Sequence, residues 1–184
     1  MSSKSLFLAV LSVLLLIQSS VFVLGATFNA EYQLQLVNNV RAKNGRPPLM
    51  LSPCLLKSAQ SHAVYQASTN TMTHNSPHGG LSARMSPYGA QGISGSAENV
   101  AYGQKSDDDV MKSWERSSGH LKNILGDYKY FGPGKAEGSR PYWTQHFANY
   151  QSCNGASAAP SNGGGNDQPR IRTPTKKASS TCDN

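Results

Sequence analysis

Apolar residues recur with a helical period near the start of the chain. Between Asn29 and Asn44 the apolar residues Tyr32, Leu36, Val37 and Val40 fall on one face of a helix. Gly45 and the two prolines that follow predict that this helix ends there.

A second helix is expected from Ser52, which suits the N-cap position, with Pro53 at the first helical position. Its apolar stripe consists of Leu55, Leu56, Ala59, Ala63 and Ala67. Because three of these side chains are only methyl groups, we expect this helix to pack closely against another element. Asn70 is expected to end it.

The middle of the chain is less regular. Residues 79–95 are rich in Gly, Ser and Pro and predict a loop with about one helical turn at 81–85. A third helix is expected to begin at Ser106. Three aspartates in its first turn would stabilise it by interacting with the positive end of the helix dipole. We expect its buried side to consist of Val110, Met111 and Trp114. Ser117 or Ser118 is expected to break it, with a short helix then running to Leu125.

Two strands are predicted near residue 140. Residues 128–136 and 142–149 read as strands joined around Glu137–Arg140, which favours an antiparallel hairpin. Helices followed by strands that pack among them indicate an α+β layered domain.

The two ends of the chain differ from the middle. Residues 1–25 resemble a signal peptide, with Lys4 before an apolar run and small residues that predict cleavage after Gly25. The alternative is a membrane anchor, but the run is barely long enough and no basic cluster follows it. Secretion and no membrane-spanning segment are therefore expected. Residues 151–184 have almost no large apolar side chains and predict a disordered basic tail rich in Gly, Ser and Pro.

The net charge of +7 is mild and dispersed along the chain. It favours contact with acidic cell-wall polymers or anionic lipid head groups and does not indicate nucleic-acid binding. Of the three cysteines, one pair is expected to form a disulfide bond in an oxidising compartment. Cys54 with Cys153 would tie the second helix to the end of the core, whereas Cys153 with Cys182 would loop the tail back. Both pairings remain open.

Two imidazoles and one carboxylate are the candidate chemical groups. Glu98 lies in a neutral stretch without a basic neighbour, so it needs backbone N–H groups or a partner such as His74 or a metal ion. With His120, these residues would supply three ligands of a zinc ion and leave one position open. Their spacing matches no metal motif. Taken alone, His74 fits a surface or loop-anchoring role better than that of a ligand. The alternative role of His120 is local capping or packing.

The other histidines have different expected roles. His62 falls beside the apolar stripe of the second helix and is interpreted as a satisfied histidine at the edge of the core. His146 alternates with Tyr142 and Thr144 on one strand face and would line the same cavity. No nucleophile elbow and no phosphate-binding loop is found.

Several blocks, taken together and in order, resemble the CAP superfamily of secreted proteins (SCP/TAPS), which includes cysteine-rich secretory, antigen and pathogenesis-related proteins. The blocks are residues 37–41, His74, Ala97–Ala101, Trp114, Ser118–Leu125 and Tyr142–Gln145. The Ser-Gly-His block at 118–120 looks like the variant typical of bacterial and some fungal or oomycete members. The resemblance implies a three-layer αβα sandwich with a small antiparallel sheet over residues 26–150.

Animal and plant members of that superfamily share a cavity with two His and two Glu that binds a divalent metal in some of them. His74 and Glu98 match the first His and the first Glu. The second Glu falls at Ser117 and the second His at Tyr142, so we expect reduced metal chemistry, with His120 as the residue that fills the vacancy.

The resemblance implies a secreted, non-enzymatic protein that binds a sterol, another small lipid, an extracellular protein or a cell-wall polymer, with roles in host interaction or defence. It would require no cofactor. The alternative is a metal-dependent extracellular protease or hydrolase, with Glu98 as base and a divalent metal such as zinc on His74 and His120. A structural cell-wall protein is a third hypothesis.

Overall fold

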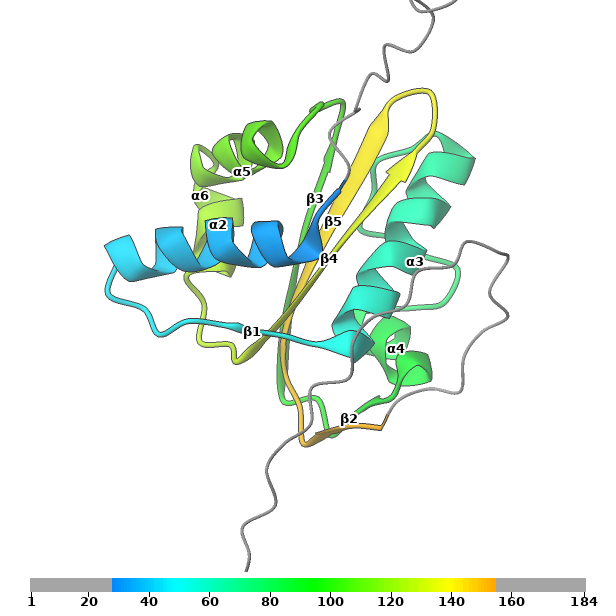
Figure 1. Ribbon diagram of the computed structural model, residues 1–184. Helices are drawn as coiled ribbons and strands as arrows, with labels where there is room; N and C mark the ends of the chain where they lie inside the picture. Colours follow the sequence, from blue (N-terminus) through cyan, green and yellow to red (C-terminus); the bar gives the residue numbers. More distant parts are fainter. Residues whose placement is uncertain (1–27, 155–184) are drawn as a thin grey trace, which may run out of the picture.

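The computed structural model describes residues 28–154 and shows a sheet with helices on both faces (Figure 1). The predicted signal peptide, and the predicted tail beyond residue 154, lie outside these residues. The elements in chain order are α2 (Ala30–Lys43), β1 (Met50–Leu51), α3 (Pro53–Thr69), α4 (Leu81–Met85), the 3-10 helix η2 (Ser86–Tyr88), β2 (Ala90–Gln91), β3 (Gly95–Tyr102), α5 (Asp107–Glu115), α6 (Ser118–Ile124), β4 (Tyr130–Glu137), β5 (Pro141–Asn149) and β6 (Ser152–Cys153).

The helices begin and end largely where the sequence predicts. The side chain of Ser52 accepts a hydrogen bond from the backbone N–H of Leu55 at the start of α3. Ser106 does the same for Asp109 at the start of α5. Asn70 ends α3 in the left-handed conformation with φ 53°. Each cap satisfies backbone groups that a helix end would otherwise leave unpaired.

The main sheet has the strand order β1-β4-β5-β3. β4 and β5 form the predicted antiparallel hairpin, and β1 runs parallel to β4. β5 also pairs antiparallel with β3, from Gly95 opposite Asn149 to Tyr102 opposite Tyr142. The sequence pattern does not predict β3 as a strand. The reason is that this strand buries Glu98 and Asn99 on opposite faces, which removes the usual alternation of apolar and polar residues.

Helix α3 covers one face of the sheet, and α2, α5 and α6 cover the other, so the expected αβα sandwich is confirmed (Figure 1). Two glycines of β4, Gly132 and Gly134, let α3 approach closely. A Cβ atom at Gly134 would lie 2.5 Å from the backbone carbonyl carbon of Ala59. The small side chains predicted to pack closely therefore meet a strand that also lacks side chains at these positions.

The apolar core lies mainly between the sheet and the α2–α5–α6 layer. Its largest buried side chains are Trp114, Trp143, Phe131 and Phe147. Cys54 and Cys153 form a disulfide bond between the start of α3 and β6, which settles one of the two pairings left open; Cys182 lies outside the described residues. Within residues 28–154, no helix is both long and apolar enough to cross a membrane.

Candidate functional site

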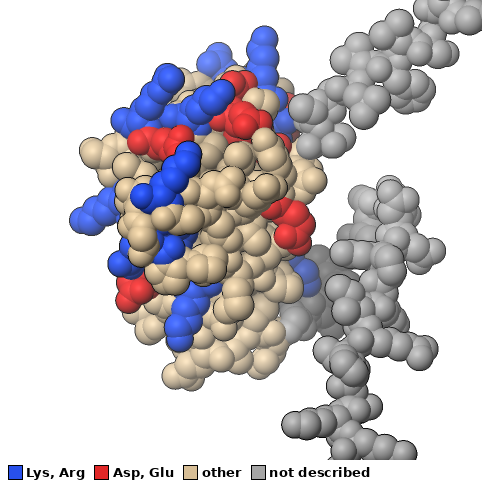
Figure 2. Space-filling model, turned by 60° about the vertical axis from the view of Figure 1, so that its left-hand side comes forward, with Lys and Arg blue, Asp and Glu red and all other residues tan. Residues whose placement is uncertain are grey.

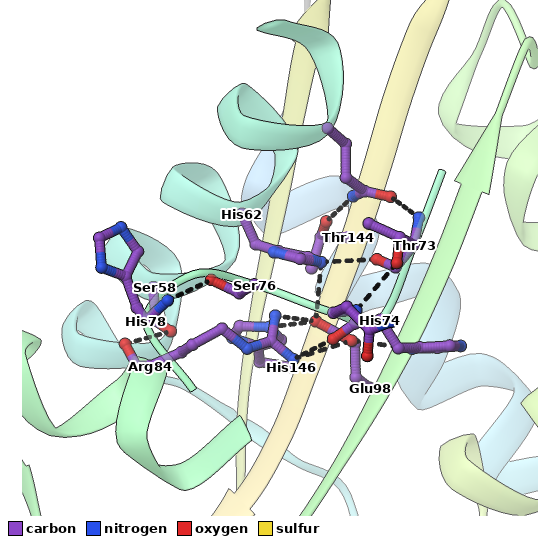
Figure 3. Close-up of polar contacts among 12 residues, drawn as sticks. Ser58, His62, Thr73, His74, Ser76, His78, Arg84, Glu98, Thr144 and His146 are labelled. Atoms are coloured by element: carbon purple, nitrogen blue, oxygen red, sulfur yellow. Dashed lines mark hydrogen bonds and ion pairs between the residues drawn. The ribbon is translucent and has the colours of Figure 1, made fainter. Parts of the chain in front are cut away.

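Glu98 lies at the centre of a polar cluster on the α3 face of the sheet (Figure 3). Its side chain is buried, and both carboxylate oxygens have close partners. Arg84 donates from Nη1 to Oε2 at 2.7 Å and from Nη2 to Oε1 at 3.0 Å. His74 Nδ1 lies 2.8 Å from Oε1, and His146 Nε2 lies 2.9 Å from Oε2. His62 Nε2 is 3.6 Å from Oε2. We call these five residues the Glu98 cluster.

The cluster holds Glu98 as a carboxylate. Burial by itself would raise its pKa, but hydrogen bonds from His146, His74 and Arg84 outweigh burial and hold the pKa well below its ordinary range. A carboxylate that binds protons this weakly is a poor general base, because an efficient base has a pKa near the working pH.

The three imidazoles of the cluster differ in the direction in which their pKa is shifted. The hydrogen bond to Glu98 raises the pKa of His74, against the opposing effect of burial. Burial lowers the pKa of His146 and of His62, and outweighs the attraction of Glu98. The permanent cation of the cluster is therefore Arg84, and His74 is the imidazole that gains a proton most readily.

Thr144 on β5 and Gln66 on α3 position the segment that carries His74. Gln66 Nε2 donates to Thr144 Oγ1 at 2.9 Å, and its Oε1 accepts from the backbone N–H of Thr73 at 3.1 Å. The carbonyl oxygen of Thr73 also lies 2.8 Å from His62 Nε2. Thr144 and Gln66 are both buried, so the backbone before His74 is fixed from the interior of the protein.

A second buried polar network lies on the opposite face of the sheet and attaches α6 to β3. Asn123 Nδ2 donates to Asn99 Oδ1 at 2.9 Å and to the backbone oxygen of Glu98 at 3.0 Å. Asn99 in turn donates to Gln145 Oε1 at 3.2 Å, and Gln145 Nε2 donates to Gln33 Oε1 at 2.9 Å. The polar residues of three sequence blocks thus hold α6 beside the strand that carries Glu98.

The structure brings together only part of the predicted set of site residues. His120 is half-buried. Its pKa is lowered, mainly by burial and to a smaller extent by the nearby His74. Its Nδ1 has no hydrogen-bond partner among the described residues. Tyr142 lies opposite Tyr102 at the far end of β3, where its hydroxyl donates to Asn70 Oδ1 at 3.0 Å. Ser117 precedes α6 and makes no side-chain capping bond within the described residues.

The sequence does not predict two members of the cluster, Arg84 and His62, as site residues. Arg84 lies in a segment whose composition predicts a loop, so nothing local marks it by itself. The signal that could have found it is the helical turn predicted around it, combined with the need of a buried Glu98 for a cation. His146, by contrast, lines the same site as Glu98, as its strand face predicted. His62 is both a buried core-edge residue and a neighbour of the carboxylate.

The donor set does not suit a divalent metal ion at Glu98. Both of its oxygens already accept hydrogen bonds, and the Arg84 guanidinium occupies the side of the carboxylate that a cation would need. In residues 28–154, no group of three or more His, Cys, Asp or Glu side chains is arranged to hold a metal ion.

One hollow lies away from the Glu98 cluster, and a second borders it. The first, of about 150 Å³, is a groove between α2 and α5. Its floor includes Leu36, Val40 and Met111, and its charged lining residues are two lysines, Lys43 and Lys112, and two acids, Asp108 and Glu115. The second, of about 140 Å³, lies between α3, the 76–78 segment and α4 with η2.

Comparisons with known proteins agree with this fold. Residues 34–147 match the family model CAP, the cysteine-rich secretory protein family. The uncharacterized protein YkwD of Bacillus subtilis (strain 168) is 36% identical over 116 residues, which are 62% of this chain and 44% of that protein.

Two solved structures have the same fold. One is an extracellular protein containing an SCP domain from Bacillus anthracis, with a TM-score of 0.60 and 25% identity over 65% of this chain and 39% of that one. The other is an outer surface protein from Borrelia burgdorferi, with a TM-score of 0.60 and 18% identity over 70% of this chain and 100% of that one. The chain spans less than half the length of the two Bacillus proteins.

Proposed function

The chain belongs to the cysteine-rich secretory protein family, CAP, and from this premise we propose that it is a secreted, non-enzymatic protein that binds a small lipid. The observation that supports a non-enzymatic function is that Glu98 has no free carboxylate oxygen with which to act as a base. Both carboxylate oxygens are engaged by Arg84 and two imidazoles, and the lowered pKa leaves the group little tendency to accept a proton.

The alternative function is a metal-dependent protease or hydrolase that uses Glu98 with His74 and His120. Such chemistry needs an activated water beside a free base and metal ligands. Here the base would have to leave its contacts with Arg84 and His146 first, and an unpaired Arg84 would then stay buried. The geometry therefore favours the binding function.

The groove between α2 and α5 supports a lipid as the ligand. Its apolar floor offers Leu36, Val40 and Met111 to an aliphatic chain. Lys43 and Lys112 line the groove together with Asp108 and Glu115, so the charges balance and the case for a lipid rests on the apolar floor. A hollow of about 150 Å³ is comparable to a cavity that binds benzene. We therefore favour a segment of a single acyl chain over the fused rings of a sterol.

The proposed location is extracellular. It rests on the signal peptide predicted for residues 1–25, and two structural relatives are described as an extracellular and an outer surface protein. Figure 2 shows Lys and Arg spread over one face with Asp and Glu among them, so a cell-wall polymer would meet dispersed charges. An extracellular protein or polymer is thus a less specific partner than a lipid.

The lipid part is tested by equilibrium uptake of a radiolabelled fatty acid and a radiolabelled sterol by the purified secreted protein. We expect saturable uptake of the fatty acid that is lost in Leu36→Glu, because the new charge would lie in the groove. The matched control is Gln35→Glu, which puts the same charge on an exposed position of α2. Uptake no better than by denatured protein would contradict lipid binding, and stronger uptake of the sterol would contradict the size argument.

The non-enzymatic part is tested by zinc calorimetry and by hydrolysis of an unstructured protein substrate. We expect neither stoichiometric zinc binding nor hydrolysis. Zinc binding or hydrolysis that disappears in His74→Ala and in Glu98→Ala would revive the metal-dependent hydrolase.

A further inference from the structure

The hollow beside α3 differs in chemistry from the lipid groove and is a separate candidate binding site. We call it the α3–α4 pocket; its nine lining residues include Ser61, His62, Tyr65, Ser76, Arg84 and Tyr88. In Figure 3, Ser76 and the stem of Arg84 lie on the α4 side of the Glu98 cluster. The floor residues His62 and Arg84 are buried, whereas Tyr65 and Tyr88 are half-buried, so the pocket has a closed floor and aromatic walls.

The size and walls of the pocket suit one flat ring. A cavity volume of about 140 Å³ is close to that of a cavity that binds benzene. Tyr65 already stacks on His62, with ring centroids 6.0 Å apart and planes inclined by 25°. A second flat ring between Tyr65 and Tyr88 would continue this aromatic packing.

The charge of the pocket suits an uncharged ligand. The nine side chains that line it include no carboxylate. The charge of Arg84 is compensated by Glu98 at 2.7 Å, and burial lowers the pKa of His62, which favours its neutral form. A charged ligand would therefore lose its hydration without meeting a free counter-charge.

Two of the lining residues, His62 and Arg84, each carry a buried polar atom that lacks a hydrogen-bond partner among the described residues, one an acceptor and the other a donor. His62 Nε2 lies 2.8 Å from the carbonyl oxygen of Thr73, which only accepts, so Nε2 bears the proton and Nδ1 is an acceptor. Within the described part of the chain, neither this Nδ1 nor the donor Nε of Arg84 has a hydrogen-bond partner. Both side chains approach the same oxygen, Oε2 of Glu98, at 3.6 and 2.7 Å, so they lie near each other.

A hydroxyl group both donates and accepts a hydrogen bond, and it is the smallest uncharged organic group that complements this pair. Ser61 adds a hydroxyl on the wall of the pocket. We propose that the α3–α4 pocket binds a small uncharged molecule made of one flat ring that carries a hydroxyl group, of which phenol is the simplest example. The site is independent of the α2–α5 groove, so the lipid experiment does not decide it.

The test measures binding of phenol and toluene to the purified secreted protein by saturation-transfer NMR and by shifts of the His62 ring signals. We expect phenol to bind about tenfold more tightly than toluene or better, because only phenol satisfies the polar floor. Ser61→Phe fills the pocket and is expected to abolish phenol binding. The matched control is Val64→Phe, which adds the same ring to an exposed position of α3 that does not line the pocket.

A second variant, Tyr88→Ala, removes one aromatic wall without adding bulk and keeps the test decisive if Ser61→Phe does not fold. Weaker phenol binding in this variant, with Val64→Phe unchanged, would support the site. Three results would overturn it: no phenol binding, equal binding of toluene, or phenol binding that neither Ser61→Phe nor Tyr88→Ala changes. If phenol does not bind, we would expect a buried water molecule to occupy the floor of the pocket instead.

Discussion

Arg84 and Glu98 are fourteen residues apart in the sequence and form a two-point ion pair inside the protein, with N–O distances of 2.7 and 3.0 Å. Arg84 comes from α4 and Glu98 from β3, so the pair attaches a helix of five residues to the edge strand of the sheet. Arg84 Nη2 also lies 3.2 Å from the backbone oxygen of His74 and donates to it. One guanidinium thus ties together the strand, α4 and the segment that follows α3.

Replacing Arg84 by alanine is expected to destabilise the protein strongly. The change would leave the Glu98 carboxylate buried without its permanent counter-ion, which typically costs about 3–5 kcal/mol. The measurement is the free energy of unfolding from urea denaturation. Arg116→Ala, at an exposed position after α5, is the matched control and should change the stability by less than about 0.5 kcal/mol. A similar loss in both variants would mean that the ion pair has no special role.

Gly134→Ala is expected to force α3 away from the sheet. The added methyl group would lie 2.5 Å from backbone atoms of Ala59 and Gln60, which cannot move independently of the helix. Overpacking of this kind typically costs about 1–3 kcal/mol.

The control is Gly119→Ala in α6, where an added Cβ meets no atom within 4 Å. This variant should be stabilised, by up to about 1 kcal/mol, because alanine favours a helix over glycine. Thermal unfolding of the two variants should therefore shift in opposite directions. A shift of the same sign and size would contradict the close packing of α3 on β4.

Removing the disulfide bond with Cys54→Ala and Cys153→Ala is expected to lower the free energy of unfolding. The bond joins residues separated by 99 positions, and a closed loop of that length is expected to contribute roughly 4–5 kcal/mol by restricting the unfolded chain. Unfolding of the double variant should be compared with the wild-type protein under oxidising conditions. Unchanged stability would mean that the bond is not formed in the purified protein.

Much of the fold could be predicted from local signals, because those signals act within one element. The caps at Ser52 and Ser106 and the end at Asn70 depend on hydrogen bonds to the nearest backbone groups, so the sequence contains them directly. β3 could not be predicted in the same way. Its buried Glu98 and Asn99 are stabilised by partners from other segments, among them Arg84 and Asn123.

The candidate site was predicted less completely for the same reason. The association of His74 with Glu98 was expected and is present at 2.8 Å. The sequence predicts backbone N–H groups, His74 or a metal ion as the partners of Glu98, and does not predict Arg84, because no basic residue lies near Glu98 in the sequence. The segment between Arg84 and Glu98 folds back, however, and brings Arg84 to the Glu98 carboxylate. Spacing along the chain gives no information about such a return.

The stability of the protein should depend on pH through His74. Its pKa is raised above the ordinary 6.5 by the hydrogen bond to Glu98, so the folded state holds the proton more tightly than the unfolded state. The resulting stabilisation is fully present below about pH 6.5 and is lost as the pH rises through the folded-state pKa. The wild-type protein should therefore exceed His74→Gln in stability by more at low pH than at high pH.

This difference should be modest, because 60% of the His74 side chain is exposed and solvent screens its contact with Glu98. Urea denaturation of both proteins at about pH 6 and about pH 8 measures it. The control is His78→Gln, which removes an imidazole from the same segment outside the Glu98 cluster and should not produce the difference. If the advantage of wild type over His74→Gln instead grew with pH, His74 would have to be neutral when it contacts Glu98. The positive charge of the cluster would then reside on Arg84 alone.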